Sequence, residues 1–361
     1  MKKVLCVITA LFMLWSLTAC STGGSGNGDK PTTSETPEAS EVPVTEAPAT
    51  SEPAAPSQSP EASETPSEPV STTEPVSETK ETITITDMTN REVTIELPVT
   101  RVVALQPADC EILYAIGAGD AVVGRGEYCD SPAEVLDIPS VQSGYDTNTE
   151  QIIELEPQVL FMSTMAQSEE QIQSLENAGV HVVVSETTDI KGVYSAIEMI
   201  GKVMGKEDNA STLIENMKTS FADLSEKAKS DEVKTVYFEV SPLQYGLWTA
   251  GSGTFMNEIA ELLGLKNCFD DVEGWASISE EQVLERNPDY IVTITMYFGE
   301  GPTPIEEILA RPGWENVTAV KNASILNLVD NELSRPSPRL VDGAKLMYDF
   351  VYGAEEAKDA A

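Results

Sequence analysis

The chain has 361 residues, of which 60 are acidic and 22 are basic, so its formal charge at pH 7 is −38. This charge argues against a nucleic-acid-binding protein, because phosphate backbones require neutralisation by Lys and Arg. The single histidine, His181, excludes sites that need several imidazoles, while a hydrophobic fraction of 41% is enough for the cores of two compact units.

The N-terminus has the pattern of an export signal. Lys2 and Lys3 precede an apolar run over 4–17, which is shorter than the about 20 residues that a membrane-spanning helix needs. The small residues before Cys20 resemble a bacterial lipobox, and this resemblance implies cleavage of residues 1–19 and diacylation of Cys20. The alternative is an ordinary signal peptide in which Cys20 occurs by chance. We expect a body held by lipid chains alone at the extracytoplasmic face of the cell membrane.

A tether is predicted over residues 20–80, starting with the lipidated cysteine. Positions 21–80 contain ten prolines, eleven acidic residues and only two lysines. Such a segment cannot bury enough apolar surface to offset the entropy of ordering it. Proline stiffness and like-charge repulsion therefore predict a disordered, extended linker.

After residue 80, short apolar runs alternate with amphipathic segments. Alternating residues at 82–86 and 92–95 predict a hairpin. Further strands are expected at 101–105, 158–162, 180–184, 233–240, 289–295 and 324–329, and helices at 109–116, 168–178, 255–263 and 305–309. This alternation predicts an α/β fold of two Rossmann-like lobes with mostly parallel sheets.

Two features predict how the lobes are arranged along the chain. The segment 148–154 recurs at 279–285, an offset of 131 residues, and each copy leads into a proline and an apolar strand. Between the copies, 207–229 carries apolar residues at helical spacing without Gly or Pro. We therefore expect an N-terminal lobe at 81–206, one long helix at 207–229 and a C-terminal lobe at 230–355.

Several phrases in this body carry a family resemblance. They are 101–107, 111–120, 128–132, the two repeated segments, 312–314 and 334–341, in family order. The chain resembles the iron-chelate/vitamin B12 family of substrate-binding proteins of ABC importers. That resemblance implies a class III periplasmic-binding-protein fold in which one rigid helix joins two lobes. It also implies a monomer that carries a metal chelate in an inter-lobe cleft to a permease dimer and its ATPase.

Catalysis is not expected, because the sequence has no nucleophile elbow, no P-loop and no cysteine beside a plausible base. A cell-surface adhesin or interaction lipoprotein is the alternative function. The paired glutamates described next argue against it.

Glu150 and Glu281 occupy equivalent positions in the two repeats. Each follows a predicted N-cap by two residues and precedes the glutamine of an expected capping box. One interpretation is stabilisation of the helix dipole. The resemblance implies instead that one glutamate per lobe docks onto arginines of the permease dimer.

Loops after strand carboxyl ends line the ligand crevice of α/β lobes. They supply the candidate ligand-binding residues Gln106, Arg125, Tyr128, Tyr145, Met165, Tyr245, Trp248, Trp275, Met296, Tyr297 and Arg335. The aromatic rings suit a large ring-rich solute, although each can equally belong to the core or the rim. Trp248, Trp275 and Arg335 also match cleft positions of the family. We expect Arg335 to donate to an anionic group of the solute, and Arg339 to be structural.

No direct metal site is expected. His181 lies in an apolar strand, where a half-buried structural role is favoured, so a metal should arrive already chelated. The solute can be a ferric siderophore, a corrinoid, or haem held by Tyr or Met. Only two cations, Arg125 and Arg335, are expected in the cleft, and this small number slightly favours a less charged solute. Cys110 and Cys129 form either a disulfide or two inert thiols.

Overall fold

The computed structural model describes residues 81–144, 147–164, 168–228, 232–297 and 299–359. The predicted signal peptide, the lipidated Cys20 and the linker lie outside the described residues, as do Tyr145 and Met165. The described residues belong to one compact unit.

The described N-terminal part contains a hairpin and a parallel sheet. The hairpin pairs β1 (Thr82–Thr86) with β2 (Glu92–Glu96) in antiparallel register, as the residue alternation predicted. The five-stranded parallel sheet has the order β5-β4-β3-β6-β7. Its strands are β3 (Val102–Ala104), β4 (Val122–Gly126), β5 (Ser140–Val141), β6 (Val159–Met162) and β7 (His181–Val184). Strands β3 and β6 are buried throughout, as expected where helices cover both faces of a parallel sheet.

The described C-terminal part repeats this plan with four parallel strands in the order β10-β8-β12-β13. They are β8 (Thr235–Glu239), β10 (Lys266–Asn267), β12 (Tyr290–Thr293) and β13 (Ile325–Asn327). A separate antiparallel pair is formed by β9 (Trp248–Ala250) and β11 (Trp275–Ser277). Both large sheets are therefore parallel, in agreement with the predicted α/β fold.

Helices connect these strands. Those of the first part are α1 (Pro107–Ala115), α2 (Thr149–Glu154), α3 (Glu169–Asn177) and α4 (Ile190–Val203). Those after β8 are α6 (Phe255–Leu262), α7 (Glu280–Arg286), α8 (Pro304–Leu309) and α9 (Thr318–Lys321). Short 3₁₀ turns lie at Gly119–Ala121, Ala133–Asp137, Leu243–Tyr245 and Trp314–Asn316.

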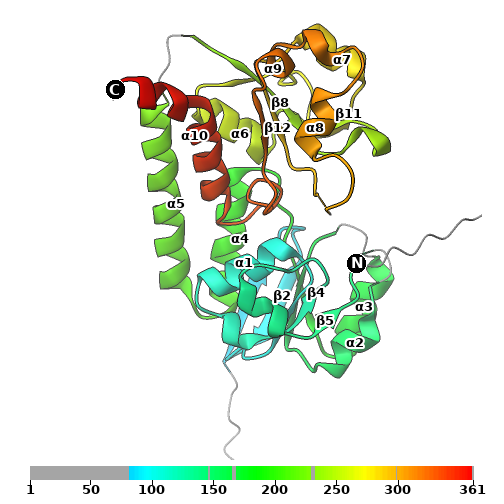
Figure 1. Ribbon diagram of the computed structural model, residues 1–361. Helices are drawn as coiled ribbons and strands as arrows, with labels where there is room; N and C mark the ends of the chain where they lie inside the picture. Colours follow the sequence, from blue (N-terminus) through cyan, green and yellow to red (C-terminus); the bar gives the residue numbers. More distant parts are fainter. Residues whose placement is uncertain (1–80, 145–146, 165–167, 229–231, 298, 360–361) are drawn as a thin grey trace, which may run out of the picture. The chain divides into compact units, whose positions relative to one another are not determined.

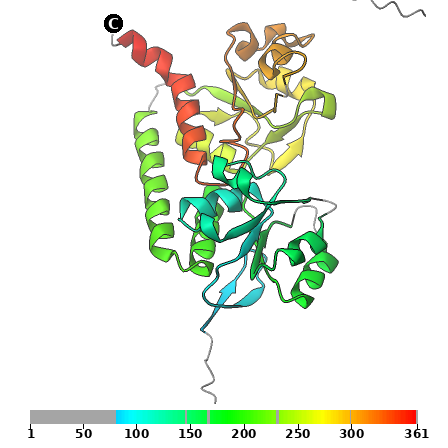
Figure 2. The same ribbon diagram turned by 60° about the horizontal axis from the view of Figure 1, so that its bottom comes forward.

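The helix expected at 207–229 is α5 (Glu207–Lys227), 21 residues long. It buries one stripe, Ala210, Ile214, Met217, Phe221 and Leu224, at helical spacing. The C-terminal helix α10 (Leu340–Asp359) packs against it, and Figures 1 and 2 show the two helices side by side. Along the chain, α5 lies between the two parallel sheets.

Some elements were not predicted. They are β4, β5, β10, the β9–β11 pair, α4, α9 and α10. The β9–β11 pair changes the interpretation of Trp248 and Trp275, which begin these two short paired strands instead of lying in open loops.

Candidate functional site

Segments that follow the parallel strands of the two sheets contact each other. The Phe255 amide of α6 donates to the Thr188 carbonyl after β7 at 2.8 Å. The Ile190 amide donates to Glu258 Oε2 at 2.7 Å. These contacts join the connection after β7 to the start of α6, and loops after strand carboxyl ends are where ligands of α/β folds bind.

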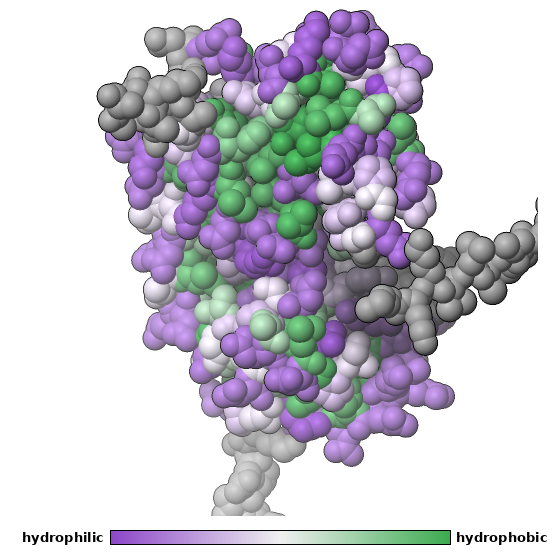
Figure 3. Space-filling view, in the orientation of Figure 1, coloured by the Kyte–Doolittle hydropathy of each residue, from purple (hydrophilic) through white to green (hydrophobic). Residues whose placement is uncertain are grey.

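A pocket of about 710 Å³ lies at the carboxyl ends of β8, β12 and β13. Its walls come from segments within 240–245, 294–307 and 331–334. Three predicted ligand residues line it, namely Tyr245, Met296 and Tyr297, and they are 76%, 48% and 43% exposed. Exposed apolar side chains gathered at a pocket mark a binding surface. Figure 3 shows that apolar residues gather on the upper part of the molecule in that view, over the C-terminal half.

Arg311 lies next to this pocket and is buried in a network of hydrogen bonds and ion pairs. Its Nη1 and Nη2 donate to the two carboxylate oxygens of Glu239, the last residue of β8, at 2.6 and 2.8 Å. Its Nε donates at 3.0 Å to Oε1 of Glu307, which lines the pocket, and the guanidinium stacks on Trp314. Burial raises the pKa of Glu239 and Arg311 only partly offsets that effect. The Arg311 guanidinium is therefore held by protein carboxylates on both sides.

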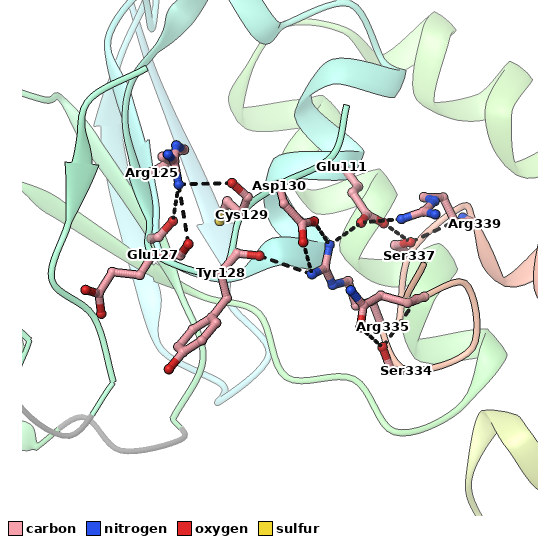
Figure 4. Close-up of polar contacts among 12 residues, drawn as sticks. Glu111, Arg125, Glu127, Tyr128, Cys129, Asp130, Ser334, Arg335, Ser337 and Arg339 are labelled. Carbon is pink, nitrogen blue, oxygen red and sulfur yellow. Dashed lines mark hydrogen bonds and ion pairs between the residues drawn. The ribbon is translucent and has the colours of Figure 1, made fainter. Parts of the chain in front are cut away.

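Arg335 forms a second buried network, shown in Figure 4. Its Nη1 donates to Glu111 Oε1 at 2.9 Å and to Asp130 Oδ1 at 2.5 Å. Its Nη2 donates to Asp130 Oδ2 and to the Tyr128 carbonyl, both at 3.1 Å. Burial alone would raise the pKa of Asp130, but the hydrogen bond and charge of Arg335 hold it below its ordinary value.

This network corrects the expectation for Arg335. Both terminal nitrogens are engaged by protein carboxylates and a carbonyl, so the guanidinium is not a free cation for an anionic solute. Arg339 Nη1 donates to the same Glu111 oxygen at 3.3 Å, and Ser337 Oγ also bonds Glu111. Arg339 therefore has the structural contacts that we expected.

Arg125 also makes hydrogen bonds within the protein, but to backbone carbonyls instead of carboxylates. Its Nε donates to the Ile138 carbonyl at 3.2 Å, and its Nη1 to the Cys129 carbonyl at 3.1 Å, so it fastens the loop after β4. Gly126 allows this loop to pass close to β3, because a Cβ there would lie 2.2 Å from the Leu105 carbonyl oxygen. Arg125 thus has internal hydrogen bonds, and its contact with the solute stays a prediction.

The other candidates lie apart from the pocket lining. Tyr128 is 67% exposed, and Figure 4 shows its ring extending away from Arg335. Gln106 occupies the N-cap position of α1 without a side-chain capping bond, and its Oε1 is buried without a hydrogen-bond partner in the described part of the chain. The Trp275 ring packs on Phe255 at a centroid distance of 5.5 Å. Trp248 and Trp275 remain partly exposed, as expected for rim residues.

Sequence reasoning missed Glu300, Glu307, Asn331 and Ser334, which also line the pocket. Glu300 and Glu307 lie in or just after the loop that supplied Met296, and Asn331 and Ser334 lie in the connection that supplied Arg335, so the same rule pointed to their segments. The choice of aromatic residues left out the polar ones. Glu111 was missed as well, although it is one of two acids, with Asp109, in the otherwise apolar sequence of α1, and a buried carboxylate favours a partner.

The two repeated helix starts differ in their caps. In α7, Ser279 Oγ accepts from the Gln282 amide, and Gln282 Oε1 accepts from the Ser279 amide, which completes a capping box. In α2, Asn148 Oδ1 accepts from the Gln151 amide, but Gln151 Oε1 accepts from the Gln142 amide instead. The capping box predicted at α2 is therefore only half formed.

The side chains of Glu150 and Glu281 are exposed at the second position of α2 and α7. A hydrogen bond from Ser279 lowers the pKa of Glu281, so this carboxylate is ionised at neutral pH. Both glutamates are accessible to a partner.

The thiols of Cys110, Cys129 and Cys268 are free and buried. Cys110 Sγ and Cys129 Sγ both approach the Ala104 carbonyl, at 3.7 and 3.6 Å. The hydrogen bond with Cys129 and burial both raise the pKa of Cys110. Of the two possibilities left open by the sequence, the structure has inert thiols.

His181 is half-buried at the start of β7. Among the described residues, no three His, Cys, Asp or Glu side chains are arranged so that they could hold a metal ion. The described helices include none with the length and apolar character needed to cross a membrane.

Comparison with known proteins gives a consistent result. The periplasmic binding protein family matches residues 102–331. An uncharacterized ABC transporter substrate-binding lipoprotein, YvrC of Bacillus subtilis, is 35% identical over 276 residues, which cover 75% of this chain and 85% of YvrC. The vitamin B12-binding protein of Vibrio cholerae is 24% identical over 72% of this chain and 91% of its own.

A solved structure is also similar. It is a possible iron-binding (periplasmic solute-binding) protein from Staphylococcus epidermidis, 31% identical, with a TM-score of 0.60. The match covers 70% of this chain and 99% of that one.

Proposed function

The chain belongs to the periplasmic binding protein family, and on that basis we propose that it captures a metal chelate and delivers it to an ABC importer. The observation that carries the proposal is the pocket at the carboxyl ends of β8, β12 and β13, with Tyr245, Met296 and Tyr297 uncovered along it. Large apolar side chains left exposed at a pocket are ready to cover the flat faces of a ring-rich solute.

The solute class is a ferric siderophore, a corrinoid or haem. The names of two relatives, one binding vitamin B12 and one possibly binding iron, support this class. The relatives named above carry the names of binding proteins.

The anchoring that we propose is diacylation of Cys20, followed by the acidic, proline-rich tether over 20–80. The similarity to a substrate-binding lipoprotein supports it. The protein would then work as a monomer at the extracytoplasmic face of the cell membrane, attached through lipid alone.

Delivery would use Glu150 and Glu281 as docking points for the permease dimer and its ATPase. Both are exposed carboxylates at matching helix positions in the two halves. Exposed carboxylates recognise arginines by charge-assisted, bidentate hydrogen bonds.

Solute capture is tested by tryptophan fluorescence of the full chain with ferric hydroxamates, ferric catecholates, haem, cobalamin and free metal ions. We expect a micromolar or tighter response to one chelate class and none to bare cations. A response to bare cations alone would contradict the proposal.

Docking is tested with Glu150→Ala plus Glu281→Ala, which should leave solute affinity unchanged and abolish uptake by cells. The matched control is Glu154→Ala plus Glu285→Ala. These exposed acids lie at or next to the last residue of the same two helices, and they are 131 residues apart, as Glu150 and Glu281 are. Normal uptake by the first double variant, or equal loss in both, would refute the docking assignment.

A further inference from the structure

The connections after the parallel strands of the two sheets are almost free of positive charge. The described residues of these connections include twelve acidic residues and only two basic ones. The connections counted are 105–106, 127–139, 142–148, 163–168, 185–189, 240–254, 268–279, 294–303 and 328–339. Acidic side chains therefore outnumber basic ones in the described part of these connections.

The two basic residues are Arg335 and Arg339, and both bond Glu111. Two further arginines make internal hydrogen bonds: Arg311 is bound by the carboxylates of Glu239 and Glu307, and Arg125 donates to carbonyls of the loop after β4. A guanidinium already bound to a carboxylate gives an incoming anion little net attraction.

The pocket lining repeats this imbalance. Its charged members are two carboxylates, Glu300 and Glu307, and it includes no Lys, Arg or His. Glu307 shares Arg311 with Glu239, whereas the side chain of Glu300 is exposed. The remaining polar groups, such as Gln244, Asn331 and Ser334, are neutral. Such a lining suits a solute that presents apolar surface together with N–H or ammonium donors.

We propose that the solute is an electroneutral or cationic chelate, and that polyanionic chelates are excluded. This inference rests on the proposed function and narrows its solute class. A trianionic ferric tricatecholate would meet two carboxylates and no basic residue in the described pocket lining, in a chain whose formal charge is −38. An uncharged ferric hydroxamate or an amide-bordered corrinoid meets no such repulsion, and a cationic chelate gains attraction from Glu300.

The test uses three ferric chelates built on one linear trihydroxamate. One carries a free terminal amine, one has the amine acetylated, and one has it succinylated, so their net charges are +1, 0 and −1. Cyanocobalamin, haem and a ferric tricatecholate complete the set. Binding to the full chain is measured by tryptophan quenching at low and high NaCl.

We expect either the trihydroxamate series or cyanocobalamin to bind, with haem and the tricatecholate at least about tenfold weaker at low salt. Within a binding trihydroxamate series, affinity should fall from +1 to −1, and the differences should shrink as salt screens them. Haem or the tricatecholate binding as tightly as the neutral chelates would overturn this inference and leave the proposed function standing. Failure of every chelate to bind would overturn the proposed function itself.

Glu300→Gln sharpens the assignment if the trihydroxamates bind. It should weaken the +1 chelate about three- to tenfold while leaving the neutral one unchanged. Glu315→Gln, at an exposed acid outside the pocket lining, is the control and should change neither. An equal effect of both variants, or none from Glu300→Gln on the +1 chelate, would contradict a role for Glu300. If cyanocobalamin alone binds, its affinity should be insensitive to both variants, and a large loss in either would count against the charge argument.

Discussion

Arg311 and Arg335 are both buried and both held by two carboxylates, yet they join different parts of the chain. The partners of Arg311, Glu239 and Glu307, lie in the same half of the molecule. The partners of Arg335 are Glu111 and Asp130, which precede it by 224 and 205 residues. One network therefore stabilises the pocket, and the other ties the C-terminal segment to the N-terminal half.

The two networks also differ in their relation to the solute. Arg311 reaches the pocket only through Glu307, whereas Arg335 directly follows Ser334, which lines the pocket. In the segment 331–339, Asn331 and Ser334 line the pocket. A few residues later, Arg339 forms an ion pair with Glu111. A solute that contacts this wall lies beside the link between the two halves.

The largest effect on folding is expected from Arg311→Ala. The variant leaves Glu239 buried without a cation, so the free energy of unfolding should fall by about 3–5 kcal/mol. Chemical denaturation of the full chain measures it. Lys345→Ala, which removes an exposed pair with Asp342, is the control and should cost less than about 1 kcal/mol. Similar losses in the two variants would contradict the distinction between buried and exposed pairs.

Asp109 shows what happens to a buried carboxyl that has no arginine. Neither of its oxygens has a hydrogen-bond partner among the residues described. Burial raises its pKa to about 7; the nearby Ser185 hydroxyl offsets this only partly, and the Glu186 charge adds to it. In the unfolded chain Asp109 has the ordinary pKa of an aspartic acid, about 3.9, so there it loses its proton at a much lower pH than in the folded protein.

The folded state therefore binds more protons at Asp109 than the unfolded state between about pH 4 and pH 7. Stability from this residue is fully present below about pH 4 and is lost as the pH rises through 7, by up to about 4 kcal/mol. Asp109→Asn should remove this dependence. Denaturation of both proteins across the range measures the difference, and parallel curves would contradict a protonated Asp109.

A smaller loss is expected from Arg335→Ala, about 1–3 kcal/mol, because Glu111 keeps its bonds to Arg339 and Ser337. Asp130→Asn should cost less than about 1 kcal/mol, since the Asp130 side chain is 51% exposed. Arg335→Ala should also weaken chelate binding, because it removes part of the link between the two halves beside the pocket wall. Unchanged chelate affinity in this variant would show that binding does not depend on that link. Denaturation and the chelate titration measure these two effects separately.

Much of the fold followed from local patterns. Strands β6 and β12 were predictable because a strand covered on both faces is a continuous apolar run. The start of α7 was predictable because Ser279 and Gln282 make a box that depends on adjacent residues alone. The β9–β11 pair was not, because three residues around Trp248 carry no periodicity.

The site was predictable in part. The rule that loops after strands line the ligand crevice selected Tyr245, Met296 and Tyr297, which do line one pocket. The same rule selected Arg335, whose partner Glu111 is 224 residues away. Nothing in local spacing shows that two such distant side chains pair, so a buried anchor was mistaken for a free cation.

The most direct measurement is chelate binding to a pocket variant, Tyr245→Ala plus Tyr297→Ala, compared with the wild-type chain. We expect micromolar or tighter binding by the wild type and at least about tenfold weaker binding by the variant, because two rings that cover the solute are lost. Leu136→Ala, at an exposed apolar residue outside the pocket lining, should bind as the wild type does. Unchanged affinity in the double tyrosine variant would show that the solute binds elsewhere and would contradict the capture of a chelate in this pocket.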